Sequence, residues 1–340
     1  MSVASTPPRA LVGPDALVFR RLRLAHDALP PAALGGRRVG QGAGALHAAL
    51  LAPDGAVFDA WAGSQPAEPR QHGCVRYATD GDWLHGMAEI DERAVGLQAA
   101  AQRAYTDLFE VLAANRCPNL LRLWNYLADI NRKDDDSDGS ERYRQFNAGR
   151  QQAFIEARHS AFEGSPAACA LGTRDGPLRV YFLAGRRPPL AIENPRQVSA
   201  YRYPDRYGPR SPTFSRAALV DVGGGRDALF ISGTASIVGH TSVHLGDVRR
   251  QTEESLRNIA TLRQVATERA GAAFAADAMI YTVYLRRPAD LEVVRAVFEQ
   301  AVGADSRAAR DAVYLQADIC RAELLVEIEA HGFVCNGRAG

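Results

Sequence analysis

Residues 218–237 read ALVDVGGGRDALFISGTASI, and this stretch decides the expected fold of the C-terminal half. Two apolar runs flank three consecutive glycines at positions 223–225. Glycine favours the backbone conformations of tight turns, so the pattern predicts two strands joined by a hairpin turn. The GGGR sequence lacks the full pattern of a phosphate-binding loop, and we therefore interpret it only as a turn.

The segments that follow alternate between helical and strand patterns. Ile259, Leu262 and Val265 recur at the spacing of an amphipathic helix. We predict a helix, a strand, a second helix and closing strands, in that order, over residues 247–270, 278–287, 290–303 and 311–330. The C-terminal unit is therefore expected to be a mixed α+β domain with two helices packed on one face of a sheet.

The N-terminal half has a different pattern. Residues 1–90 are rich in proline, glycine and short apolar runs, which favour short strands and turns. Three helices are predicted after them, over residues 90–117, 119–132 and 141–154. The first of these has a helical apolar stripe formed by Val95, Leu97, Ala101, Tyr105, Leu108 and Val111.

The two halves are joined by a loop-rich segment, residues 188–216, that contains six prolines and three tyrosines. Loops of this length and aromatic content are usually functional or ordered against a neighbouring surface. We therefore predict an N-terminal α+β domain over 1–187, an ordered connector over 188–216 and the C-terminal domain over 217–335.

Bulk composition excludes several classes of function. The net charge of +1 provides no overall field for DNA or RNA, and Lys133 is the only lysine, so anions would be bound by arginine. The five cysteines form no CxxC pair, which argues against a zinc site or a disulfide framework and favours a reducing compartment. With no leader pattern and no apolar run of about 18 residues, we expect a cytoplasmic protein without a membrane contact.

Two motifs match metal-binding patterns only in part. Residues 134–139 match the D-x-D-x-D-G start of a calcium loop, but Gln145 stands where a bidentate glutamate is expected. His240 and His244 are four residues apart, and no third ligand is apparent. We predict no metal site.

Residues 318–332, DICRAELLVEIEAHG, contain the most informative chemistry. Residues 326–330, VEIEA, alternate between apolar and acidic side chains, which predicts a strand. On one uninterrupted strand, Cys320 and Glu327 would face opposite sides. They are therefore either a core thiol and a surface carboxylate, or two members of one site brought together by a turn at 321–324.

The C-terminal segments LFISGTASIVG, QTEESLRNI, YTVYLR and VEIEA resemble the RidA/YjgF fold. Together with RYRQFNAGR and YRYPDRYGPRSPTFSRA upstream, the chain resembles the chorismatase family over residues 120–340. Members of this family remove the enolpyruvyl group from chorismate. The resemblance implies chorismate as a small-molecule substrate and no cofactor.

The resemblance also implies roles at the C-terminal strand. Glu327 corresponds to the acidic catalytic residue of the family, and Glu329 is expected to be structural; the alternative is that both lie on a solvated strand face. Cys320 and Gly233 match the subgroup that forms 3-hydroxybenzoate, whereas the hydrolysing subgroup has alanine at both positions. The alternative for Cys320 is a small buried hydrophobic residue.

Candidates for holding the substrate carboxylates lie elsewhere. Tyr143 and Arg150 are seven residues apart, so a helix places them on one face, and Arg142 adjoins them. A solvated arginine-rich helix face is the alternative reading of that spacing. Arg286, at a strand end, is a second carboxylate candidate, and Tyr207 on the connector is a hydrogen-bonding candidate.

We therefore expect a lyase that converts chorismate to 3-hydroxybenzoate, with 4-hydroxybenzoate as an additional product in some relatives, and pyruvate. Two alternatives stay open: hydrolysis to a dihydroxycyclohexadiene carboxylate, and a RidA-like binding protein without activity. RidA proteins are trimers with sites between subunits, and a two-domain chain can build the equivalent interface internally, so a monomer or a homotrimer is expected.

Overall fold

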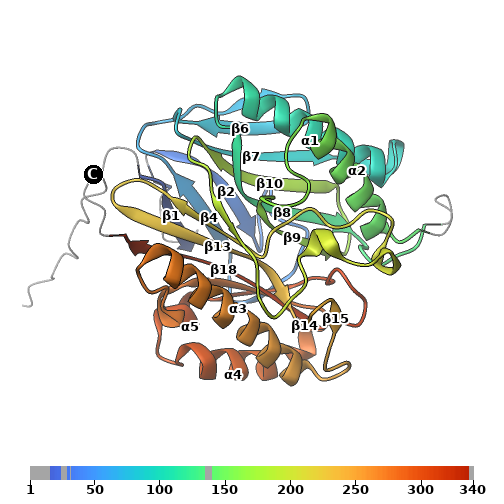
Figure 1. Cartoon of the computed structure of the whole chain (residues 1–340), viewed down its shortest axis with the longest axis vertical. Coiled ribbons are helices and arrows are strands. Elements are labelled where there is room, and N and C mark those ends of the chain that lie inside the picture. The colour runs from blue at the N-terminus through green and yellow to red at the C-terminus, as the bar shows by residue number, and fades with distance from the viewer. Residues whose placement is uncertain (1–15, 24–28, 31, 135–139, 337–340) are drawn as a thin grey trace, which may run out of the picture.

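Four layers make up the molecule: two sheets face each other, and helices cover the outer face of each sheet (Figure 1). The first fifteen residues, where no leader was expected, and most of the D-x-D-x-D-G run lie outside the described part of the chain. The computed structural model describes residues 16–23, 29–30, 32–134 and 140–336.

The first large sheet has the strand order β5–β6–β7–β10–β8–β9 and belongs to the N-terminal half. Helices α1 (Leu97–Ala114) and α2 (Arg142–Glu156) cover its outer face. Its strands are β5 (Arg70–His72), β6 (Val75–Thr79), β7 (Trp83–Ile90), β8 (Asn119–Ala128), β9 (Ala167–Thr173) and β10 (Leu178–Gly185).

The two N-terminal helices pack closely against each other. The predicted stripe from Leu97 to Val111 is buried in α1, whereas Val95 precedes the helix and is exposed. A Cβ atom on Gly149 of α2 would lie 2.0 Å from the backbone oxygen of Gln98 in α1. Glycine at this position therefore permits the close helix contact that fixes the face of α2.

The prediction of a helix over residues 119–132 is wrong, because Asn119–Ala128 forms the strand β8. This strand lies between β10 and β9, and all of its residues except the two ends are buried. A strand that is buried on both faces reads as a continuous apolar run, and periodicity alone does not separate such a run from a buried helix.

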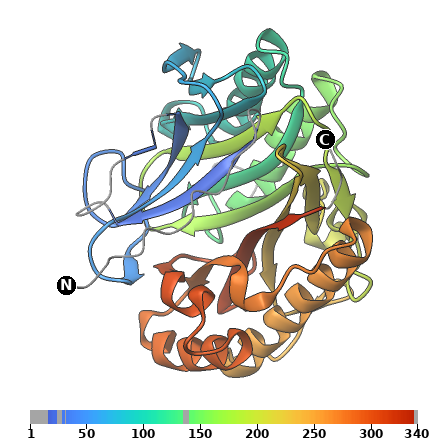
Figure 2. The same cartoon turned by 90° about the vertical axis from the view of Figure 1, so that its left-hand side faces the viewer.

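The second large sheet has the order β11–β12–β13–β18–β16–β17–β3. Helices α3 (Val248–Ala270) and α4 (Leu291–Val302), with the short α5 (Arg307–Asp311), pack on its outer face (Figure 2). Its strands are β11 (Leu190–Ile192), β12 (Ala217–Asp221), β13 (Arg226–Ala235), β18 (Val326–Cys335), β16 (Ile280–Leu285), β17 (Val313–Gln316) and β3 (Leu50–Ala52). The predicted α+β class, the hairpin at the three glycines and the two helices on one face are confirmed.

The alternation in β18 places its two kinds of residue in different layers. Val326, Ile328 and Ala330 pack toward α3 and α4. Glu327 and Glu329 point the other way, into the space between the two sheets, and both are buried. The polar face of this strand is therefore an interior face, not a solvated one.

A third, three-stranded sheet with the order β1–β4–β2 contributes to the core between the large sheets. It consists of β1 (Val18–Arg23), β2 (Ala33–Val39) and β4 (Val57–Ala62), and a small hairpin, β14 (Ile237–Val238) and β15 (Thr241–Ser242), follows β13. The division into domains around 188–216 stays a prediction, although β3 and β11 lie in the sheet of the C-terminal half. None of the helices in the described part of the chain is long and apolar enough to cross a membrane.

Candidate active site

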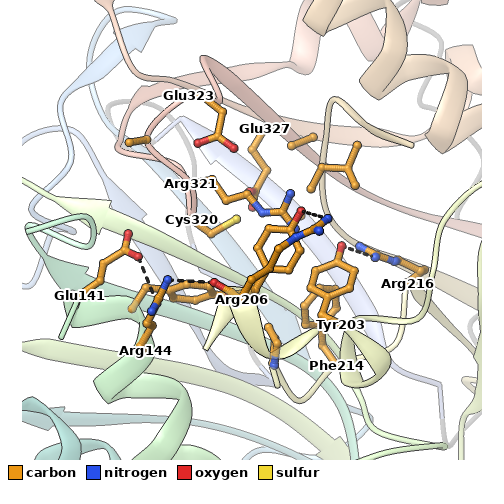
Figure 3. Close-up of a pocket in the computed structure, with 17 residues that line it drawn as sticks. Glu141, Arg144, Tyr203, Arg206, Phe214, Arg216, Cys320, Arg321, Glu323 and Glu327 are labelled. Atoms are coloured by element: carbon orange, nitrogen blue, oxygen red, sulfur yellow. Dashed lines mark hydrogen bonds and ion pairs between the residues drawn. The ribbon is translucent and has the colours of Figure 1, made fainter. Parts of the chain in front are cut away.

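A cavity of about 350 Å³ opens between α2, the connector and the C-terminal sheet (Figure 3). Its size is that of a site for a small organic ligand. The connector forms one wall, which includes Tyr203 and the short 3₁₀ turn Asp205–Tyr207, and the segment from Cys320 to Glu327 forms another. Residues from both halves of the chain thus meet at one concave surface.

Glu327 is the buried acid of this cavity. Its exposed fraction is 3%, and its carboxyl group makes no hydrogen bond or ion pair with the described residues. Burial, and then the negative charge of Glu329, raise the pKa of Glu327 to about 8 against the lowering effect of Arg122 and Arg216. A carboxylic acid in this environment keeps its proton at neutral pH and can act as a general acid.

Glu329, two residues along the same strand, has the opposite environment. Arg37 donates a hydrogen bond to it at 3.0 Å, and Arg122 forms an ion pair with its second oxygen. Burial alone would raise the pKa of Glu329, but these two guanidinium groups outweigh it and lower the pKa to about 2. The two carboxyl groups of β18 therefore differ in protonation because they differ in surroundings.

Gly233 on β13 lies against the Glu327 carboxyl group. A Cβ atom at this position would lie 1.9 Å from Glu327 Oε1 and 2.9 Å from Cys169 Cβ. A side chain at position 233 would therefore require the Glu327 carboxyl group and Cys169 to shift.

Cys320 and Glu327 both line the cavity, because the chain turns between them before β18 begins at Val326. Of the two alternatives, the structure thus has both residues in one site. Burial raises the pKa of the Cys320 thiol to about 12, so the thiol is neutral in the free protein.

The turn that carries Cys320 is held by Arg286. Its guanidinium group donates hydrogen bonds to the backbone oxygens of Leu324, Ile319 and Arg321 at 2.8–3.1 Å, and it pairs with Asp318. Arg286 does not line the cavity. Its donors are used by backbone oxygens and by the side chains of Asp318 and Asn131, so it stabilises the turn and does not face the cavity.

Three arginines of the cavity wall have a buried nitrogen without a hydrogen-bond partner among the described residues; that of Arg144 lies 3.8 Å from Glu141, whereas those of Arg321 and Arg216 have no acidic neighbour at that distance. Arg321 Nη1 donates to the backbone oxygen of His240 and to Ser242, each at 3.0 Å, while Nη2 is buried without a partner. Arg216 donates from Nη2 to Val198 O and to the Tyr203 hydroxyl, while its Nε is buried without a partner. Buried donors of this kind are rare in proteins and point to a ligand that supplies the acceptor.

Aromatic rings fix these guanidinium groups. Arg321 lies over the Tyr207 ring at 4.0 Å and near Tyr203 at 5.2 Å, while Arg216 lies over Phe214 at 5.3 Å. The Tyr207 hydroxyl donates to the backbone oxygen of His240 at 2.7 Å, which anchors the connector to the hairpin β14–β15. Stacking of this kind restricts side-chain freedom and pre-orients the arginine forks.

The helix α2 contributes Tyr143 and Arg144 to the cavity. Burial raises the pKa of the Tyr143 hydroxyl well above its usual value, so it is a neutral donor. Arg150 is 1% exposed, donates to Asn147 at 2.8 Å, and has two buried nitrogens without partners among the described residues. It lies outside the cavity wall, and its positive charge acts on the adjacent Tyr143.

Five of the eight predicted site residues line the cavity: Tyr143, Tyr207, Gly233, Cys320 and Glu327. Arg142, Arg150 and Arg286 do not. Arg142 is buried and bound to Glu92, Asp134 and the backbone oxygen of Ala128, so its donors are occupied.

Four arginines of the cavity were not predicted, namely Arg144, Arg206, Arg216 and Arg321. Three of them adjoin predicted residues, since Arg144 follows Tyr143, Arg206 precedes Tyr207 and Arg321 follows Cys320. That adjacency was the available signal, but nearly all positive charge in this chain is arginine, so the residue type alone carries little information. No group of three or more histidine, cysteine, aspartate or glutamate side chains suited to a metal occurs in the described ranges.

Comparisons with known proteins identify the family. Residues 59–184 match the family model described as chorismatase FkbO/Hyg5-like, N-terminal. A 3-hydroxybenzoate synthase of Streptomyces hygroscopicus is 37% identical over 295 residues, which cover 84% of each chain. The chain belongs to the chorismatase family.

Two further chorismatases support this assignment. A chorismatase of Streptomyces rapamycinicus is 41% identical over 286 residues, covering 81% of this chain and 82% of the relative. The crystal structure of a chorismatase superposes with a TM-score of 0.81 and 31% identity, covering 94% of this chain and 98% of that one. The chorismatase fold therefore extends over nearly the whole chain.

Proposed function

We propose that this chorismatase converts chorismate to 3-hydroxybenzoate and pyruvate. The observation that carries the proposal is the environment of Glu327: a buried, unpaired carboxyl group faces a cavity whose walls present unused arginine donors. A protonated acid beside anion-binding groups is the arrangement needed to expel a carboxylate-bearing leaving group.

Chorismate has two carboxylates, and the cavity offers for each a separate guanidinium group with one unused nitrogen. Figure 3 shows Arg321 beside Cys320 and Glu327, and Arg216 farther along beside Tyr203. We assign the unused Nη2 of Arg321 and the unused Nε of Arg216 to these carboxylates. The neutral hydroxyl of Tyr143 and the positive charge of Arg150 behind it supply additional attraction for an anion.

The conversion requires only proton donors and acceptors from the protein, since the bond changes occur within chorismate. Hydroxybenzoate and pyruvate together contain all the atoms of chorismate, so the reaction calls for no oxidant, reductant or water. In the proposed course, the ring hydroxyl oxygen gives up its proton to solvent and attacks the neighbouring ring carbon as the enolpyruvyl oxygen leaves, and Glu327 protonates the leaving group. The epoxide oxygen takes up a proton as the epoxide opens, and the ring loses a proton and aromatises. The enol product becomes pyruvate, and Glu327 regains a proton from solvent.

Cys320 and Gly233 support the aromatic product over the hydrolytic one. Gly233 permits the position of Glu327, and Cys320 places a neutral thiol in the same cavity. We propose that the thiol directs opening of the epoxide toward 3-hydroxybenzoate, as the resemblance to the benzoate-forming subgroup implies. 4-Hydroxybenzoate is the expected minor product.

The assembly and location are part of the same proposal. Both halves of the chain contribute residues to the cavity wall, which supports a monomer that builds this interface internally, with a homotrimer as the alternative. All five cysteines are free thiols, which supports a reducing compartment such as the cytoplasm.

The test is incubation of the purified protein with chorismate, with products separated by liquid chromatography and pyruvate measured in parallel. The proposal predicts pyruvate equimolar with total hydroxybenzoate, most of which is 3-hydroxybenzoate. Pyruvate with a non-aromatic diol would overturn the assignment of the product, and binding of 3-hydroxybenzoate without any pyruvate would overturn the assignment as an enzyme.

A further inference from the structure

The two glutamates of β18 form an unequal pair. Glu327 and Glu329 point into the same layer, and their exposed fractions are 3% and 5%. Glu329 accepts hydrogen bonds from Arg37 and from the Tyr284 hydroxyl, each at 3.0 Å, and pairs with Arg122. Glu327, which makes no such bond within the described ranges, faces the cavity instead.

The charged cluster around Glu329 does not touch the cavity. Arg37, Arg122 and Glu329 all lie outside its wall, and the exposed fractions of their side chains are 7%, 2% and 7%. Buried ion pairs are often no better for stability than apolar residues of the same volume, because both charges lose their hydration. A stabilising role therefore explains this cluster poorly, and its position beside the cavity acid offers a better explanation.

We propose that the Arg37–Glu329–Arg122 cluster is a positioning unit, in which the fixed negative charge of Glu329 keeps the neighbouring Glu327 protonated and Arg122 limits that effect. The inference rests on the proposed function in one respect, namely that Glu327 is the proton donor. It adds a second layer of residues, none of which contacts the substrate.

Arg321 lies beside Glu327 on the cavity wall and stays unchanged in every variant compared below. The other groups around Glu327 are neutral. They are the phenol of Tyr284, opposite Glu327 on β16, the phenol of Tyr143 on α2, and the thiols of Cys169 on β9 and Cys320. Burial raises the pKa of each of these four groups above its usual value. The remaining charges that act on Glu327 are Glu329, which raises its pKa, and Arg122 and Arg216, which lower it.

The geometry predicts that two charge-removing substitutions shift the pH at which Glu327 loses its proton in opposite directions. Glu329→Gln removes the repelling anion and leaves the nearby guanidinium groups, so Glu327 loses its proton at a lower pH. Arg122→Gln removes an attracting cation and leaves Glu329 paired with Arg37, so Glu327 keeps its proton to a higher pH. Arg122→Lys retains the charge and is the matched control.

The experiment is an infrared difference titration of the free protein, in which the carboxyl band of Glu327 is identified by its loss in Glu327→Gln. We expect the midpoint to move by about one pH unit or more, downward in Glu329→Gln and upward in Arg122→Gln, with Arg122→Lys close to wild type. The alkaline limb of kcat/KM for chorismate should move in the same directions. Loss of stability alone would lower the folded fraction but would not move the midpoint.

Folded Arg122→Gln with an unchanged or lowered midpoint would overturn the inference, and so would an unchanged or raised midpoint in Glu329→Gln. Since Arg122→Gln leaves Glu329 with a partner, it decides the question by itself if Glu329→Gln does not fold. The titration needs no substrate. Opposite midpoint shifts without turnover of chorismate would therefore overturn the proposed function and support the charge coupling.

Discussion

The absent side chain of Gly233 makes room for the carboxyl group of Glu327. A Cβ atom at position 233 would lie 1.9 Å from Glu327 Oε1, and 2.9 Å from Cys169 Cβ on the facing sheet. These neighbours lie on strands of two packed sheets, so relief by a backbone shift is costly. The position of the Glu327 carboxyl group therefore depends on glycine at position 233.

The substitution Gly233→Ala tests this relationship. The added methyl group would push the carboxyl group away from the substrate, and we expect 3-hydroxybenzoate formation to fall at least about tenfold, since misplacement of a general acid raises the barrier. Chromatography of the products measures the effect. Addition of Cys320→Ala should move the product toward the diol, whereas Gly233→Ala with wild-type rate and product would contradict the relationship.

Arg321 and Arg216 are expected to act in substrate binding. Arg321→Gln and Arg216→Gln each remove a charge-assisted hydrogen bond, and we expect KM for chorismate to rise about 10- to 100-fold. Arg210→Gln is the matched control, because this connector arginine is exposed, lies outside the cavity and binds Gln151. Equal KM values for Arg321→Gln and Arg210→Gln would rule out the proposed fork.

The raised pKa of Glu327 predicts a pH-dependent difference in stability. Between its ordinary value of 4.5 and about 8, the folded protein holds a proton on Glu327 that the unfolded chain releases. The contribution of this group to the free energy of unfolding therefore decreases as pH rises through that window. Urea unfolding at pH 5 and pH 8.5 measures the free energy of unfolding of both proteins. Relative to wild type, the value for Glu327→Gln should be higher at pH 8.5 than at pH 5 by a few kcal/mol. A difference that is the same at both pH values would contradict the shift.

Arg286 is expected to stabilise the turn and not to bind substrate. Arg286→Met removes the donors to three backbone oxygens, which would leave buried acceptors unpaired and cost about 2–5 kcal/mol of unfolding free energy. Thermal unfolding and 3-hydroxybenzoate binding measure the two effects separately. If Arg286→Met kept its melting temperature and lost binding more strongly than Arg321→Gln, Arg286 would be a ligand residue after all.

Sequence patterns predicted those parts of the fold whose two faces differ. The alternation at Val326–Cys335 and the stripe in Leu97–Ala114 both arise because one side of the element meets an apolar layer. The strand Asn119–Ala128 was predicted as a helix because both of its faces are buried, so its apolar residues show no strand periodicity. The chain sequence also carries no signal that β3, near residue 50, completes a sheet formed mainly after residue 190.

The candidate site could be predicted in part, through the resemblance of short motifs to the chorismatase family. Glu327 and Gly233 were assigned from that resemblance, because alternation alone also allowed Glu327 to lie on a solvated strand face. Arg216 and Arg321 owe their roles to rings and backbone groups that come from distant segments, and only the fold brings these together. Arg142 and Arg286 matched the expected residue type, but the fold uses their donors for internal hydrogen bonds.

Turnover of chorismate by Glu327→Gln tests the central claim most directly. Glutamine keeps the size of the side chain and removes the acidic proton, so binding of 3-hydroxybenzoate should persist while pyruvate release falls by about 10²-fold or more. Circular dichroism and calorimetric titration establish folding and binding in the same preparation. A folded variant that binds the product and releases pyruvate at near wild-type rate would contradict the assignment of Glu327 as the proton donor.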